Sequence, residues 1–185
     1  MDTLLDILGA SFVGGMVLLI VVNIYIFSSQ KRIASSADLR LQQNAKTLAE
    51  ILNNDLRKVG YKHSKNAIIT AEQKKFSFYA DVDSNGTVDQ VTYLLSDSTQ
   101  ALGTKNPHDI VLYRVVDGDT SKGPSLGLTK LNFHYRNTSG DLTSVIDSIK
   151  YINVEMWIET TEPVDDSTYP FTYWEMNVNP RNIDY

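Results

Sequence analysis

The chain has 185 residues, of which 42% are hydrophobic and 21% are charged, and its formal net charge is −5. It contains no cysteine, so thiol catalysis, disulfides and cysteine-ligated zinc sites are excluded. The 17 basic residues are scattered along the sequence and form no cluster, which argues against a nucleic-acid-binding surface.

The first predicted element is a membrane-spanning helix. No residue from 7 to 27 is charged, and a helix of that length rises through about 30 Å, the thickness of the hydrocarbon core of a bilayer. The run is apolar on every face, which is unusual for a core helix of a soluble domain. Asp2 and Asp6 precede it, whereas a cleaved signal peptide begins with basic residues. We therefore expect residues 1–28 to form a transmembrane or filament-core helix that is retained.

The helix is predicted to continue, with one apolar face, as far as residue 60. No proline or glycine interrupts it between Phe27 and Val59, and Gly60 follows as a C-cap. Polar residues, Asp55 among them, occupy the other faces. Apolar residues recur every three or four positions, the spacing of one helix face: Ile33, Ala37, Leu41, Ala45, Leu48, Leu52, Leu56 and Val59. Residues 29–60 are thus an amphipathic continuation that packs against another part of the fold.

Residues 61–185 are predicted to form an antiparallel β-sheet domain. Alternation of apolar and polar residues, bounded by turn-forming residues, marks the candidate strands. These strands cover residues 75–80, 88–95, 110–116, 131–135, 152–158 and 171–178. Such alternation is typical of a sheet with one covered face, and we expect the amphipathic helix to cover it. The predicted fold class is α+β, one long helix packed on one antiparallel sheet, with long loops at 96–107 and 117–127.

This plan resembles that of type IV pilins and type II secretion pseudopilins. Four short segments add to the resemblance, especially to the W-type minor pilins and J-type pseudopilins: Thr3–Leu8, Asn54–Tyr61, Phe76–Asp81 with Asn85-Gly86, and Val178–Asn182. The chain departs from these families in carrying Asp6 where they have glutamate, and in lacking the proline found in the middle of many pilin helices.

The resemblance implies a structural subunit of a pilus-like filament or secretion pseudopilus. It implies a single pass through the inner, cytoplasmic membrane and an extracytoplasmic sheet domain, which is extracellular or periplasmic once assembled. Its partners would be other pilin or pseudopilin subunits. Lys31 and Arg32 alone would place the sheet domain in the cytoplasm by the positive-inside rule, but we follow the resemblance. The alternative is an extracytoplasmic binding module that the helix merely tethers.

The candidate assembly residues are Asp6, Ala10, Ser11, Gly14 and Gly15. The pairs Ala10/Gly14 and Ser11/Gly15 are small residues four apart, which let membrane helices approach closely. Alternatively, they reflect the ordinary tolerance of membrane helices for glycine. The resemblance implies that Asp6 pairs with the N-terminal amine of a neighbouring copy. The other interpretation places Asp6 at the lipid headgroups, where it interacts with the helix dipole.

The candidate metal ligands are Asp81, Asp83, Asn85 and Asp89, which supply oxygens at the spacing that opens an EF-hand loop. Thr92 stands where that loop needs its final acidic residue, and strands rather than helices flank the segment, so it is not an EF-hand. Two interpretations remain. The loop binds calcium, the one cofactor that the sequence suggests, or it is a hairpin in which Asn85-Gly86 supply the left-handed residues.

No enzymatic activity is predicted. Gly123–Gly127 matches the G-x-S-x-G string, but no strand precedes it and no helix follows it, as the nucleophile elbow of a hydrolase requires. His63, His108 and His134 are scattered, with no acidic partner evident in the sequence.

Overall fold

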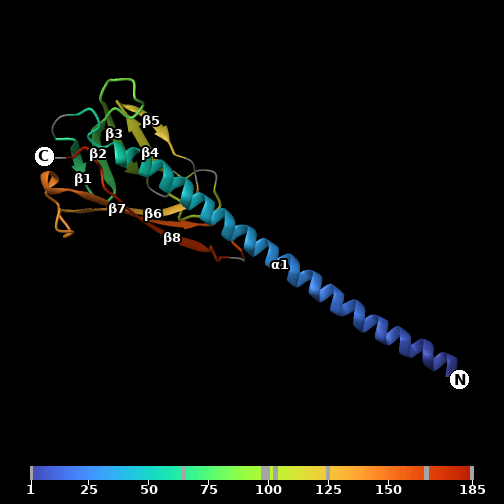
Figure 1. The fold of residues 1–185 in the computed structure, drawn as a ribbon. Coiled ribbons are helices and arrows are strands. Elements are labelled where there is room, and N and C mark those ends of the chain that lie inside the picture. Colours follow the sequence, from blue (N-terminus) through green and yellow to red (C-terminus); the bar gives the residue numbers. More distant parts are fainter. Residues whose placement is uncertain are drawn as a thin grey trace. The chain divides into compact units, whose positions relative to one another are not determined.

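The computed structural model describes residues 2–63, 66–96, 101, 104–123, 126–164 and 167–183. They form one long helix and two antiparallel sheets, so the predicted α+β class is confirmed (Figure 1). The chain divides into two compact units, Met1–Leu39 and Arg40–Tyr185.

The first unit consists of the N-terminal part of helix α1, which runs from Asp2 to Lys58. The large apolar side chains from Leu4 to Phe27 are between 43% and 74% exposed. Among the described residues, α1 is the one helix that is long and apolar enough, by length and composition, to cross a membrane. Its apolar surface therefore lies open within this chain.

In the second unit, the C-terminal part of α1 packs against both sheets through one face. Six apolar residues of that face are at most 4% exposed: Leu41, Ala45, Leu48, Leu52, Leu56 and Val59. The predicted stripe is confirmed over this range. It is wrong at Ile33, which is 62% exposed and belongs to the first unit, where α1 is the one element among the described residues.

The C-terminal end of α1 is set by Gly60. This glycine has φ of +79°, and the amide of the following Tyr61 donates a 2.7 Å hydrogen bond to the Lys58 carbonyl. A side chain at Gly60 would collide with the backbone carbonyl of Asn182 near the C-terminus. Gly60 thus turns the chain out of the helix, as the sequence predicts, and also allows a close backbone approach.

The first sheet has five strands in chain order, each antiparallel to the next. They are β1 (Ile68–Ala71), β2 (Lys75–Ala80), β3 (Asp89–Leu95), β4 (Leu112–Val116) and β5 (Asp119–Lys122). The predicted loop at 117–127 is wrong, because β5 lies within it. All four residues of β5 are exposed and none is apolar, so the strand forms through backbone pairing at a sheet edge and leaves no alternating pattern.

The second sheet has three antiparallel strands, β6 (Leu128–Arg136), β7 (Tyr151–Glu159) and β8 (Phe171–Val178), with the 3₁₀ helix η2 (Ile146–Ser148) between β6 and β7. The prediction of a single sheet is therefore wrong. The sheets meet where the amide of Phe133 donates to the Gln73 carbonyl (2.9 Å) and the Tyr135 hydroxyl donates to the Glu72 carbonyl (2.8 Å). The alternation of apolar and polar residues along a strand does not indicate which strands pair, so the sequence pattern could not predict that the strands divide into two sheets.

One hydrophobic core joins the helix and both sheets. The Phe76 ring in β2 lies 5.8 Å from the Phe133 ring and 5.7 Å from the Tyr135 ring, both in β6, measured between ring centroids. Aromatic rings at these distances pack favourably in tilted arrangements. The core is thus continuous across the gap between the two sheets.

We expect Leu52→Ala to lower the free energy of unfolding of the second unit by about 2–5 kcal/mol, because it empties a fully buried site between helix and sheets. Ile33→Ala is the matched control on the same helix, and it should change stability by less than about 0.5 kcal/mol. Urea unfolding of the detergent-solubilised chain, followed by the fluorescence of Trp157 and Trp174, measures both. Equal losses for the two variants would contradict this account of the helix.

Candidate functional site

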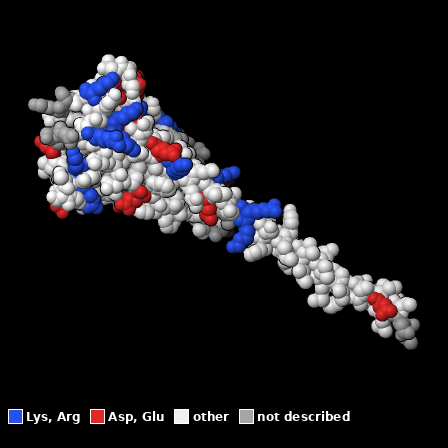
Figure 2. Space-filling view, in the orientation of Figure 1, with Lys and Arg blue, Asp and Glu red and all other residues white. Residues whose placement is uncertain are grey.

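The predicted assembly residues lie on the open surface of α1 in the first unit. Apart from the adjacent residues and the backbone of the helix itself, no atom lies within 4 Å of the Cβ position at Gly14 or Gly15. Ala10, Ser11 and Asp6 are exposed. Figure 2 shows a long stretch of this helix that carries neither basic nor acidic side chains. Residues four apart are neighbours on a helix surface. The pairs Ala10/Gly14 and Ser11/Gly15 therefore each form a shallow depression between bulky apolar side chains.

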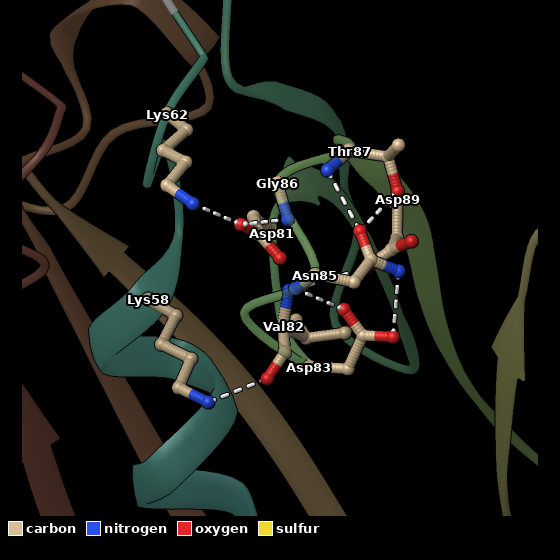
Figure 3. Close-up of polar contacts among 9 residues, drawn as sticks. All are labelled: Lys58, Lys62, Asp81, Val82, Asp83, Asn85, Gly86, Thr87 and Asp89. Atoms are coloured by element: carbon tan, nitrogen blue, oxygen red, sulfur yellow. Dashed lines mark hydrogen bonds and ion pairs between the residues drawn. The ribbon is translucent and has the colours of Figure 1, made fainter.

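The predicted metal ligands lie in the loop Asp81–Val88 between β2 and β3 (Figure 3). The left-handed residues of this loop are Ser84 (φ 64°) and Gly86 (φ 96°). The hairpin prediction is confirmed for the antiparallel pairing of β2 with β3 and for Gly86, and it is wrong for Asn85, since Ser84 supplies the other left-handed residue. Asn85 instead folds the loop with its side chain, which donates to Asp83 Oδ2 (2.8 Å) and accepts from the Thr87 amide (2.7 Å).

Three of the four predicted ligands converge. One oxygen each from Asp81, Asp83 and Asp89 lies within 4.8 Å of the others. Asp81 is fully buried and Asp89 is 6% exposed, whereas Asp83 is exposed. The Asn85 side chain is engaged within the loop, where its nitrogen donates to Asp83 and its oxygen accepts from Thr87. The loop therefore concentrates three carboxylates at the end of β2 and the start of β3.

A lysine faces this cluster. Lys62 Nζ lies 2.6 Å from Asp81 Oδ2, which also accepts a 3.0 Å hydrogen bond from the Gly86 amide. The hydrogen bond from Lys62 lowers the pKa of the Asp81 carboxyl, and the same bond raises the pKa of Lys62. Asp81 is thus held ionised, with one of its two oxygens fully engaged.

A buried polar network that the sequence pattern does not predict lies beneath the helix. Asp55 is 6% exposed and accepts hydrogen bonds from the Tyr93 hydroxyl (2.7 Å) and from Arg114 Nε (2.6 Å). Burial, together with the Asp55 carboxylate, raises the pKa of Tyr93 well above its usual range. The assignment of Asp55 to a polar face was wrong. Its spacing from Leu52 and Val59, three and four residues, was the available signal, since that spacing places it on the buried face.

A second polar cluster lies near the end of β7. Asn106 Nδ2 donates to Glu159 Oε2 (2.8 Å), and His108 Nδ1 lies 3.0 Å from the same oxygen. His134 similarly lies 3.3 Å from Glu155 through Nε2. Two of the three histidines thus have an acidic partner on β7, which was not evident in the sequence because β7 is distant from them along the chain. Ser125, the serine of the G-x-S-x-G string, lies outside the described residues.

The carboxyl group of Asp109, beside this cluster, is buried. Its side chain is 1% exposed, and among the described residues neither carboxyl oxygen has a partner. Burial raises the pKa of Asp109 above its ordinary value, and the Glu159 carboxylate adds to this shift, while Thr104 and His108 oppose it. A carboxylate in this position costs folding free energy whenever it is ionised.

The chain matches no family model, no curated protein and no solved structure. The resemblance to pilins and pseudopilins therefore stays a prediction.

We expect Asp109→Asn to make the protein more stable than the parent at pH 7, and this gain to shrink as the pH falls toward 4. The reason is that the folded-state pKa of Asp109 lies above its unfolded value, so the parent recovers stability as this group takes up its proton at low pH. Urea unfolding at both pH values measures the effect. Asp119→Asn, at an exposed site, is the control and should show no such gain. A gain that is the same at both pH values would argue against this explanation.

Proposed function

We propose that the chain is a membrane-anchored structural subunit of a pilus-like filament or secretion pseudopilus, which assembles through its N-terminal helix. The exposed apolar surface of the first unit is the observation that supports this most directly. Removing one large apolar side chain from water contributes about 1.5–3 kcal/mol, and this helix leaves such side chains from Leu4 to Phe27 exposed. A surface of this kind is stable only in lipid or against other apolar helices.

The proposed partners are other pilin or pseudopilin subunits, and the small residues support close helix packing. Lipid tails are as apolar as leucine, so helices gain by associating in a membrane mainly where their backbones approach closely. Gly14 and Gly15, with Ala10 and Ser11 one turn earlier, allow such an approach. The proposed partner of the Asp6 carboxylate is the N-terminal amine of a neighbouring copy, since an unpaired charge within lipid is costly.

The sheet domain is placed outside the cytoplasmic membrane in this proposal. The second unit has its own core and needs no lipid, which is compatible with an extracytoplasmic position before assembly and an extracellular or periplasmic one afterwards. Lys31 and Arg32 would favour the opposite orientation by charge alone, so the orientation rests on the resemblance and needs its own test.

The second candidate function is a binding module for which the helix is only a tether. The observation in its favour is the exposed aromatic surface of the edge strand β8, where Phe171 is 66%, Tyr173 44% and Trp174 36% exposed. Exposed apolar groups on an unpaired strand edge are typical of surfaces that meet a partner.

Gly14→Leu tests assembly against tethering. We expect it to leave membrane insertion intact and to abolish filament formation, because a large side chain would hold neighbouring helices apart. Gly9→Leu is the matched control. Gly9 lies on the other side of the helix from Gly14 and should tolerate the change. Electron microscopy of sheared filaments, with membrane levels by immunoblot, measures the result. Filaments of normal number from Gly14→Leu would refute close helix packing at Gly14, and an absence of filaments from the parent chain would favour the tether.

Protease treatment of spheroplasts tests the orientation. We expect added protease to degrade the second unit from Arg40 onward, because the proposal places it outside the cytoplasmic membrane. Full protection in intact spheroplasts, with degradation after lysis, would place this unit in the cytoplasm and refute the proposed orientation.

A further inference from the structure

We propose that the loop between β2 and β3 binds a calcium ion through Asp81, Asp83 and Asp89. The first argument is the spacing of their oxygens. Calcium binds oxygen ligands at about 2.3–2.6 Å, so two oxygens on opposite sides of one ion lie about 5 Å apart. The three carboxylates of this loop each place an oxygen within 4.8 Å of the others. Magnesium demands near-ideal octahedral geometry and keeps several of its waters, so a site built from three side-chain carboxylates suits calcium better.

The second argument is an oxygen without a partner. Asp81 is 0% exposed, and among the described residues its Oδ1 has no hydrogen-bond partner. The other oxygen, Oδ2, is engaged by Lys62 and by the Gly86 amide. Figure 3 shows the free oxygen on the side of the carboxylate away from Lys62. A buried, ionised oxygen without a partner lowers the stability of the fold, and a bound cation would supply the missing partner.

The third argument is charge. Three carboxylates meet at the loop, whereas Lys62 is the one basic side chain that forms an ion pair with them among the described residues. Lys58, nearby, is directed to the Val82 carbonyl, with a Nζ–O distance of 2.5 Å. A divalent cation would balance the remaining negative charge, and exposed Asp83 leaves the ion open to solvent on one side.

Lys62 then has a defined role, because it shares Asp81 with the ion. Two cations that neutralise one carboxylate repel each other, so the ammonium of Lys62 weakens calcium binding. At about 5 Å, this repulsion corresponds to roughly a tenfold change in affinity even when water screens it. Lys62 therefore stabilises the loop when no ion is bound, and it lowers the affinity of the loop for calcium.

The site lies beside the end of helix α1. The Asp81 amide donates a 3.1 Å hydrogen bond to the Tyr61 carbonyl, and Lys58 donates to the carbonyl of Val82. An ion bound at Asp81 would therefore stabilise the junction between the helix and the first sheet. This inference does not rest on the proposed assembly function, and it holds for a tethered module as well.

The test uses the full chain in detergent, stripped with chelator and titrated with CaCl₂ or, separately, MgCl₂. We expect calcium at about 1–10 mM to raise the unfolding temperature by about 5 °C or more, because it exceeds about tenfold the dissociation constants of about 0.1–1 mM typical of extracellular calcium modules. Magnesium should have a smaller effect. Calorimetric titration gives the dissociation constant directly. No calcium-dependent rise in unfolding temperature and no binding heat would overturn the proposal.

Three variants locate the ion. Asp83→Asn removes an exposed ligand and should abolish the calcium-dependent rise. Asp119→Asn makes the same change at an exposed site in β5 and should keep it. Lys62→Gln should lower the calcium dissociation constant by roughly tenfold, because the competing charge is gone. A full calcium response in Asp83→Asn, its loss in Asp119→Asn, or unchanged or weaker binding in Lys62→Gln would each refute the site.

Discussion

The burial of one face of helix α1 against both sheets is the interaction on which the second unit depends. A three-stranded and a five-stranded sheet each present an apolar face that must be covered, and the helix residues from Leu41 to Val59 cover both within one core. Burying each leucine of this face contributes about 1.5–3 kcal/mol. The same face carries Asp55, and its bonds to Tyr93 and Arg114 tie the helix to β3 and β4 with specific geometry. Apolar burial thus supplies the stability, and the buried polar network helps to define how the helix sits on the first sheet.

A single helix serves two different purposes because its surface changes along its length. In the first unit its apolar side chains are exposed, and in the second its apolar face is buried, although no residue interrupts the helix between them. Both parts are apolar for the same physical reason, the cost of exposing such side chains to water. They differ in what covers the apolar side chains. In the second unit these are the sheets of the same chain, and in the first unit, under the proposed function, they are lipid or neighbouring helices.

The acidic residues of the second unit show how burial decides their role. Asp55, Asp81 and Asp109 are all buried, but each meets a different environment. Asp55 accepts hydrogen bonds from an arginine and a tyrosine through Oδ2. Among the described residues, Asp81 keeps one buried oxygen without a partner and Asp109 keeps two, whereas Asp55 keeps none. A carboxylate that keeps a buried, unpartnered oxygen is either a cost that the fold tolerates or a place for a ligand. The convergence of two further carboxylates on Asp81 favours a ligand there, and no such convergence occurs at Asp109 among the described residues.

Sequence patterns alone are enough to predict the long helix, its buried face beyond Leu41, its end at Gly60, and strands such as 75–80 and 171–178, whose predicted bounds agree with the structure. These features follow from the polarity of residues close together in the chain, which a periodic pattern records. The tertiary structure alone decided that the strands form two sheets, that the polar segment of β5 is a strand, that Asp55 lies inside, and that Lys62 faces the three carboxylates of the β2–β3 loop. Strand pairing, burial and ion pairing depend on residues that are distant in sequence, and no local pattern records where those residues meet.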